Sequence, residues 1–126
     1  MPFNDEWFVF WGGTNEFVNY HYAYETQRYA YDFVKVEDGH TFADTPLINE
    51  NYYAFGADVV APFSGTVVKV VDGFIDNIPG EMEPEYPTGN YIVIKHPNDE
   101  YSLLAHFKQG SICVKECDVV KEGQLL

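Results

Sequence analysis

The stretch from Gly89 to Phe107, GNYIVIKHPNDEYSLLAHF, predicts the fold of this chain. Its first half holds a run of β-branched and aromatic residues, Tyr91 to His96, and its second half holds a similar run, Tyr101 to Phe107. The intervening sequence Pro-Asn-Asp-Glu is typical of a turn, because Pro, Asn and Asp favour turn conformations. Two β-prone runs separated by so short a turn predict an antiparallel hairpin.

Short β-prone runs continue on the N-terminal side of this hairpin. Trp7 to Trp11 (WFVFW) predicts one strand, and Gly65 to Gly73, which follows a Pro-Phe-Ser-Gly turn, predicts another. Asn19 to Tyr24 and Gln27 to Val36 are also β-prone, and Glu25-Thr26 between them is placed to form a turn. No segment shows the apolar periodicity of an amphipathic helix of three turns. The sequence therefore predicts an all-β fold, with antiparallel sheets in an open barrel or sandwich.

Two longer segments lack strand character and predict loops. Glu37 to Ala54 is rich in Asp, Gly, Thr, Pro and Asn, and Asp76 to Thr88 holds three prolines, a glycine and several acidic residues. We expect the second segment to be an exposed excursion, because irregular segments of this composition run over protein surfaces. The chain shows no repeat of fixed period, and its length suits one domain spanning residues 1–126.

The composition argues against several classes of partner. Hydrophobic residues make up 46% of the chain, so we expect a substantial core rather than disorder. The formal net charge of −13 argues against nucleic acid and anionic membranes, because both need a basic face. No apolar run approaches the roughly 20 residues that span a bilayer, so membrane insertion is not expected. The N-terminal sequence MPFNDEWFVF lacks the basic region of a signal peptide.

Two cysteines, Cys113 and Cys117, lie four residues apart. This spacing alone is a poor zinc signal, because a structural zinc site normally uses four ligands. We expect two free or buried thiols, with a disulfide and a metal site as the alternatives.

Four histidines are the main candidates for chemistry: His21, His40, His96 and His106. His40 follows Asp-Gly in a predicted loop and carries no functional signal. His96 ends the first strand of the hairpin, where it would line a cleft. His106 follows an apolar run, and a polar side chain in that position usually needs a hydrogen-bonding partner. A histidine in a hairpin is nevertheless more often a packed residue than a metal ligand.

His21 and Asp32 form the candidate pair for a metal site. They are separated by an odd number of positions, so one continuous strand would place them on opposite faces, and they meet only if the chain reverses at Glu25-Thr26. A neutral imidazole with a carboxylate is a common part of a catalytic zinc site, which has three protein ligands and an open position for water. Zinc lowers the pKa of that water and polarises a carbonyl group, and a further histidine then serves as acid, base or oxyanion stabiliser.

Three motifs follow His21 and Asp32 in a specific order. They are Ala-Pro-x-x-Gly-Thr-Val at residues 61–67, Gly-Asn-Tyr-Ile-Val-Ile-x-His at 89–96 and Ala-His-Phe at 105–107. From about residue 19 to the last residue, this order resembles the M23 family of zinc metallopeptidases, the lysostaphin-like or LytM-like endopeptidases that cut peptidoglycan cross-bridges. The resemblance implies an open barrel or sandwich of the duplicated hybrid motif type and a Zn²⁺ cofactor.

The resemblance also implies roles for individual residues. His21 and Asp32 match the first two zinc ligands, and His106 matches the unligated catalytic histidine. His96 lies at the strand end where the family often has a histidine, and it joins His106 as a candidate catalytic residue. The implied function is hydrolysis of peptide cross-links, with peptidoglycan peptide stems or cross-bridges as the partner. The implied location is extracellular, periplasmic or associated with the cell wall.

The chain departs from the family pattern in two ways. The usual first motif is His-x-x-x-Asp, but Arg28 stands four residues before Asp32, so His21 fills the role only with a longer excursion. The family's His-x-His motif, which brings the third zinc ligand, is missing, since no histidine follows His106. We therefore expect the third ligand to lie beyond Leu126 and the peptidase domain to be incomplete at its C-terminus. We expect weak zinc binding and little or no hydrolysis by these residues alone.

Two other functions compete with the peptidase. A metallopeptidase-like module that has lost its metal would serve in cell-wall binding or as a scaffold, and the missing third ligand favours this. The strand pattern around Ala61-Pro62 and from Val120 to Leu125 also resembles phosphotransferase-type carrier domains, in which His106 or His96 would take a phosphoryl group. The carrier hypothesis explains the β-rich pattern but not the pairing of His21 with Asp32.

Overall fold

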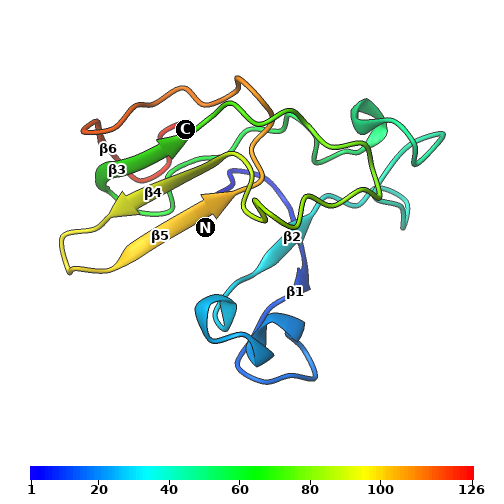
Figure 1. Cartoon of the computed structure of the whole chain (residues 1–126), viewed down its shortest axis with the longest axis horizontal. Helices are drawn as coiled ribbons and strands as arrows, with labels where there is room; N and C mark the ends of the chain where they lie inside the picture. The colour runs from blue at the N-terminus through cyan, green and yellow to red at the C-terminus, as the bar shows by residue number, and fades with distance from the viewer.

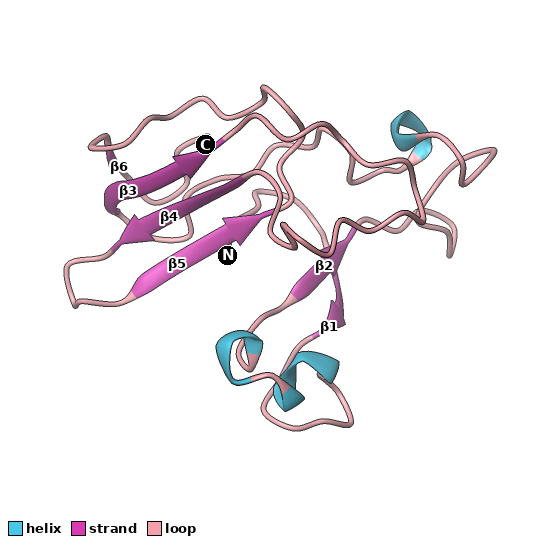
Figure 2. Ribbon diagram, in the orientation of Figure 1, coloured by secondary structure: helices cyan, strands magenta, loops and turns pink.

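The computed structural model describes residues 1–126, and its regular structure is strand apart from three short 3₁₀ helices (Figures 1 and 2). The strands are β1 (Phe8–Trp11), β2 (Asp32–Val34), β3 (Gly65–Val71), β4 (Tyr91–Lys95), β5 (Tyr101–Ala105) and β6 (Val119–Val120). The 3₁₀ helices are η1 (Tyr20–Ala23), η2 (Glu25–Gln27) and η3 (Asn49–Asn51). All strand pairs are antiparallel, in one sheet of order β1-β2 and another of order β5-β4-β3-β6. The predicted all-β class with antiparallel sheets is confirmed. None of the three helices has the length and apolar character needed to cross a membrane.

The predicted hairpin forms one side of the four-stranded sheet, with β5 as the edge strand and β4 next to it. β4 and β5 pair from Tyr91 opposite Ala105 to Lys95 opposite Tyr101, and the Pro-Asn-Asp-Glu sequence joins them. The valine-rich β3 pairs with the other side of β4. Its β-branched side chains suit the pleated surface of a sheet. Its pairing with β4 shifts between Val67 and Lys69, which is the pattern of a β-bulge.

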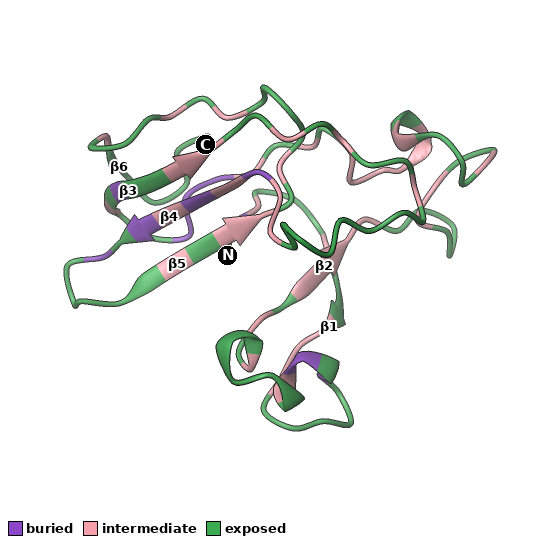
Figure 3. Cartoon of the chain, viewed as in Figure 1, coloured by how far each residue is buried: buried purple, intermediate pink, exposed green.

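The hydrophobic core lies against this larger sheet. Along β4 the buried and partly exposed residues alternate, and Ile92 and Ile94 are fully buried (Figure 3). Val67 of β3 and Val120 of β6 join them, and Leu126 closes the cluster through the hydrogen bond from its N–H to the carbonyl of Val59. Only 13 of 126 residues are buried, so the core is smaller than the composition predicts.

Many of the large apolar residues missing from the core are exposed, on the smaller sheet and its neighbouring turns as well as on the long loops and the larger sheet. Phe8 and Phe10 of β1 are 57% and 59% exposed. Phe3 stacks on Trp7 with ring centroids 3.9 Å apart and meets the edge of Phe33. Phe33 belongs to β2, so these rings pack against the ribbon, whose two strands pair through their backbones.

Two predicted strands in this region need correction. Asn19 to Tyr24 is not a strand but the cap and turn of η1. Asn19 caps the helix by accepting the N–H of His21 on its side chain, and this local hydrogen bond competes with an extended backbone. The predicted strand from Gln27 to Val36 shortens to β2, which pairs with β1 instead of the preceding segment. The chain still reverses between His21 and Asp32, through η1 and η2 rather than a hairpin turn.

The two predicted loops are largely irregular in the structure, with η3 inside the first of them. Residues 72–90 leave β3, run past the end of the larger sheet and return to β4, while residues 37–56 lie farther out (Figure 1). The side chain of Asn90 connects the segment of residues 72–90 to the sheet by hydrogen bonds. Its side chain accepts the N–H groups of Gly73 and Phe74 and donates to the carbonyls of Phe74 and Phe107.

Candidate functional site

The structure brings His21 and Asp32 into direct contact. The Nε2 atom of His21 lies 3.0 Å from Oδ1 of Asp32, across eleven positions of sequence. His21 belongs to η1 and its side chain is 11% exposed, whereas Asp32 begins β2 and its side chain is 38% exposed. The pair thus combines a nearly buried imidazole with a carboxylate that solvent reaches.

Asn19 builds the turn that makes this contact possible. Its side chain is fully buried, and its amide nitrogen donates to the carbonyls of Gly13, Arg28 and Ala30 at 3.0, 3.1 and 3.2 Å. Its amide oxygen accepts the N–H of His21 at 3.1 Å. The hydrogen bonds of one side chain therefore connect the start of η1 to Arg28 and Ala30, which lie four and two positions before Asp32.

Gln27 completes the surroundings of the imidazole. Its side-chain Oε1 lies 2.9 Å from Nδ1 of His21, on the side of the ring opposite to Asp32. Both ring nitrogens thus face oxygen atoms, but a neutral imidazole carries a single N–H. With a neutral ring, the tautomer therefore decides which of the two contacts holds the hydrogen.

An aromatic ring packs beside the same pair. The ring of Tyr20 lies over that of His21 with centroids 4.0 Å apart, and its other neighbour is Trp11 of β1 at 5.5 Å. Burial, then the charge of Asp32, raises the pKa of Tyr20 above its ordinary value. A phenol with a raised pKa stays protonated and remains able to donate a hydrogen bond beside the carboxylate.

His106 follows directly after β5, whose end points toward the β1–β2 ribbon (Figure 1). Desolvation lowers the pKa of His106, and the charges of Asp32 and His21 act on it with opposite signs. The three predicted residues therefore lie within electrostatic range of one another. His106 is exposed on one side, yet enough protein surrounds its ring to disfavour the imidazolium form.

The backbone of His106 is held in an unusual conformation. Its φ angle is +66°, in the left-handed region that a non-glycine residue rarely adopts. Two hydrogen bonds fix it there, from its own N–H to the carbonyl of Thr88 and from Phe107 N–H to the carbonyl of Asn90. Strained residues of this kind cluster at functional sites, where the surrounding structure over-determines them.

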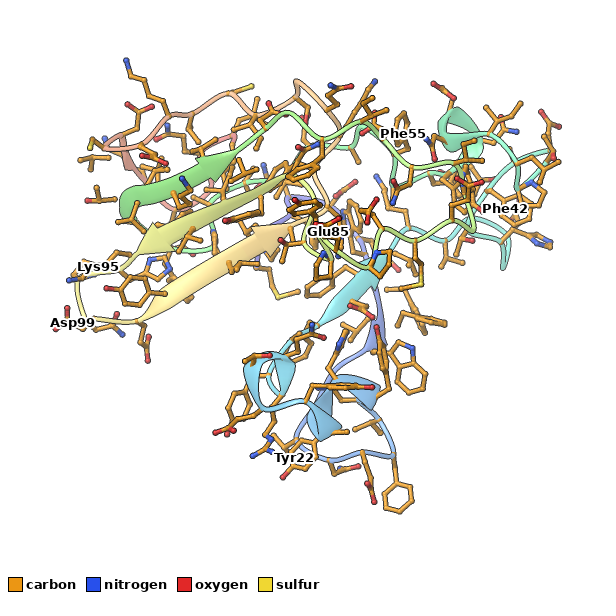
Figure 4. The ribbon with its side chains drawn as sticks, in the orientation of Figure 1. Tyr22, Phe42, Phe55, Glu85, Lys95 and Asp99 are labelled. Atoms are coloured by element: carbon orange, nitrogen blue, oxygen red, sulfur yellow. The ribbon has the colours of Figure 1, made fainter.

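A shallow depression of about 350 Å³ opens beside His106. Its walls come from the two long loops, with Tyr52 and Phe55 on one side and Pro79 and Gly80 on the other. Phe55 lies under the ammonium group of Lys108 at 4.8 Å from the ring centroid, at the end of the larger sheet nearer to the loops (Figure 4). This depression offers partly apolar contacts to a group bound next to His106.

His96 is placed elsewhere. It follows β4 at the opposite end of the hairpin from His106, beside the turn marked by Lys95 and Asp99 in Figure 4. It is buried, its Nδ1 donates to the carbonyl of Ser64 at 3.0 Å, and its Nε2 lies 2.8 Å from Oγ of Ser102. With both nitrogens engaged in the sheet, His96 has the contacts of a structural residue, and the structure does not bring it to His21 and Asp32.

The remaining predicted donors stay apart from this site. Cys113 and Cys117 are exposed in the structure, and no disulfide joins them. His40 is exposed in a tight β-bridge with Glu37. No group of three or more histidine, cysteine, aspartate or glutamate side chains is placed to hold a metal ion. The candidate site therefore has two donor side chains from this chain.

Sequence reasoning missed three residues of the site. Asn19 carries a signal, since an asparagine just before a short helical turn is a preferred cap. Gln27 and Tyr20 carry none, because their importance comes from contacts with His21 that need the folded turn. Comparisons with protein-family models, with curated proteins and with solved structures found no match.

Proposed function

We propose that this chain carries the metal-binding pair and a catalytic histidine of a zinc-dependent endopeptidase that hydrolyses peptide cross-links of bacterial peptidoglycan. The observation that carries the proposal is the His21–Asp32 contact with His106 in electrostatic range of both. The ordered motifs that resemble the M23 peptidases support the same assignment. The proposal includes their open-barrel or sandwich architecture of the duplicated hybrid motif type and a location at the cell wall, outside the cytoplasm.

The donor atoms fit a zinc ion. Imidazole nitrogen and carboxylate oxygen are both common zinc ligands, and their separation of 3.0 Å is close to the roughly 3.3 Å edge of a tetrahedral zinc shell. Two protein ligands are one fewer than catalytic zinc sites normally use, so we expect this chain to bind zinc weakly.

Each residue then has a defined task. His21 and Asp32 would hold zinc, which when bound activates water and polarises a peptide carbonyl. The lowered pKa keeps His106 neutral near pH 7, so its ring accepts a proton or donates a hydrogen bond to the developing oxyanion. The depression between the two loops would orient the substrate next to His106.

The test separates metal binding from turnover. The chain is freed of metal with a chelator, supplied with excess zinc, and analysed for bound zinc and for new amino termini released from purified peptidoglycan. We expect His21→Ala and Asp32→Ala to lose the metal, and His106→Ala to keep the metal and lose the slow cleavage. His40→Ala, in an exposed loop, is the matched control and should change neither. Failure of the unaltered chain to bind zinc would overturn the proposal.

One observation favours a second function. Because no three donor side chains are grouped, the fold also suits a metallopeptidase-like module that binds or organises the cell wall without catalysis. The same experiment distinguishes the two functions. Absence of zinc binding and of any release of amino termini, together with retention on peptidoglycan after His106→Ala, would favour the non-catalytic module.

A further inference from the structure

We propose that Lys108 is a specificity-determining residue, which selects substrates that carry a carboxylate next to the bond to be cleaved. The inference rests on the proposed peptidase function and names the substrate class that this function would prefer. It concerns the depression beside His106 and the lysine at the border of that depression.

The walls of the depression are connected by hydrogen bonds, so its shape is present before a ligand binds. Asn49, on one wall, donates from its side-chain amide to the carbonyl of Asn77 in the loop of the other wall, at 2.8 Å. Asp76 of the second loop accepts the N–H of Gln109 at 2.7 Å, which connects this wall to the segment after His106. A preformed site loses less conformational entropy when it binds a ligand.

Lys108 is held at the border of this depression. Its ammonium nitrogen lies 4.8 Å from the ring centroid of Phe55, which lines the depression, in the geometry of a cation–π interaction. Its stem passes over Gly56, where an added Cβ would lie 3.9 Å from Cδ of the lysine. The stem and the ammonium group therefore both rest on the same loop, which limits the freedom of an otherwise exposed side chain.

The ammonium group of Lys108 makes no ion pair, although the chain holds 20 acidic and only 7 basic residues. The lysines that do form ion pairs are Lys35, Lys69 and Lys95. Asp72 and Asp76 accept backbone N–H groups of residues 109–110 instead, at 2.7 Å each. A cation without an anionic partner is available to a carboxylate of a ligand, and such a contact is a charge-assisted hydrogen bond.

The charge of the whole chain makes this lysine decisive for an anionic ligand. With a formal net charge of −13, the chain repels anions at long range. A carboxylate is consequently favoured here only if a local cation offsets that repulsion. Lys108 is the second residue after His106, and two residues of backbone span at most about 7 Å. The selected carboxylate therefore belongs to a residue close to the scissile bond, either on a side chain or at a chain terminus.

The experiment measures peptide binding to the metal-free full chain, so that it depends neither on zinc nor on turnover. The peptides are N-acetyl-triglycine with a free C-terminal carboxylate, its C-terminal amide, and N-acetyl-glycyl-glutamyl-glycine amide. Backbone amide resonances of the ¹⁵N-labelled chain at low salt report the affinity, and residues 49–56 and 106–108 should shift. We expect one or both carboxylate peptides to bind about two- to fivefold more tightly than the neutral amide, which is the range that an exposed ion pair supports.

Three variants assign the preference to the charge of Lys108. Lys108→Met keeps the stem and removes the charge, so the neutral amide should bind at least as tightly as the carboxylate peptides, because only the long-range repulsion remains. Lys108→Arg should retain the preference for a carboxylate. Lys121→Met is the matched control and should change nothing. It removes the same charge from an exposed lysine after β6, at the end of the larger sheet opposite to His106.

Failure of this inference can be distinguished from failure of the proposed function. If the chain binds no zinc, the peptidase proposal fails, but the peptide titrations still test Lys108. Equal affinities of the unaltered chain for the carboxylate peptides and the amide, or no response of residues around the depression to any peptide, would overturn the role of Lys108 even if zinc binds. An equal loss of preference in Lys108→Met and Lys121→Met would overturn it too, because net charge alone would then explain the effect.

Discussion

His21 and Asp32 touch at 3.0 Å because Asn19 closes the turn between them. The contact depends on the chain path rather than on strand alternation, since η1 and η2 lie between the two residues. A pair built in this way is sensitive to the residue that holds the turn. The stability of the turn and the affinity of the site for metal should therefore respond to the same substitution.

We first predict that Asn19→Ala destabilises the chain by about 3 kcal/mol, because it removes a helix cap and leaves buried carbonyls without a donor. Zinc binding should weaken in parallel, since Asp32 loses its fixed position relative to His21. The free energy of unfolding in urea and the zinc affinity measure the two effects. Asn15→Ala, which removes one exposed side-chain hydrogen bond to Phe17 N–H, should cost no more than about 1 kcal/mol. Equal losses for the two variants would contradict the prediction.

The second prediction concerns the strained backbone of His106. Because its φ angle is +66°, His106→Gly should be more stable than His106→Ala by about 1 kcal/mol, since glycine adopts this conformation without a steric penalty. Leu103 is an exposed residue inside β5, where glycine only adds flexibility to the unfolded chain. Leu103→Ala should therefore be more stable than Leu103→Gly. Thermal and urea unfolding of the four variants provide the comparison. An alanine variant as stable as the glycine variant at position 106 would show that the left-handed conformation carries no strain.

The third prediction follows from the lowered pKa of His106. Desolvation places this pKa below the ordinary value of 6.5 in the folded chain, so the unfolded chain binds more protons as the pH falls through that value. The contribution of His106 to stability is thus present above 6.5 and is lost as the pH falls toward the folded-state pKa. His106→Asn, which tolerates positive φ and does not titrate here, should lose less stability than the unaltered chain between about pH 8 and pH 5. Outside this pH range, the two profiles of unfolding free energy should run parallel. Identical slopes within the range would refute the prediction.

The fourth prediction tests the packing of the larger sheet. A methyl group added at Gly65 would lie 2.7 Å from Cγ2 of Ile94 and closer still to the carbonyl oxygen of Lys95. Gly65→Ala should therefore cost about 1–3 kcal/mol, because the neighbouring β4 backbone has to move. Gly73→Ala meets no atom within 4 Å and is the control, with a small effect or a gain of stability. A melting temperature unchanged by Gly65→Ala would contradict the close approach of β3 and β4.

The larger sheet could be predicted from the sequence because its signals are local. The hairpin of β4 and β5 follows from two β-prone runs and the turn between them, and the strand character of β3 follows from its valines. The turn from Asn19 to Asp32 could not be predicted correctly, because its tyrosines favour a strand by composition. The hydrogen bonds of Asn19 outweigh that preference, and they involve carbonyls that the sequence does not place.

The sequence by itself determined the all-β class, the hairpin, and the choice of His21, Asp32 and His106 as candidates, since residue type and order carry that information. Tertiary structure decided which of the candidates meet. It joined His21 to Asp32 and put His106 near them, and it placed His96 at the far end of the hairpin. It also placed Gln27 behind the imidazole, because proximity across a turn depends on backbone angles and buried hydrogen bonds rather than on residue spacing.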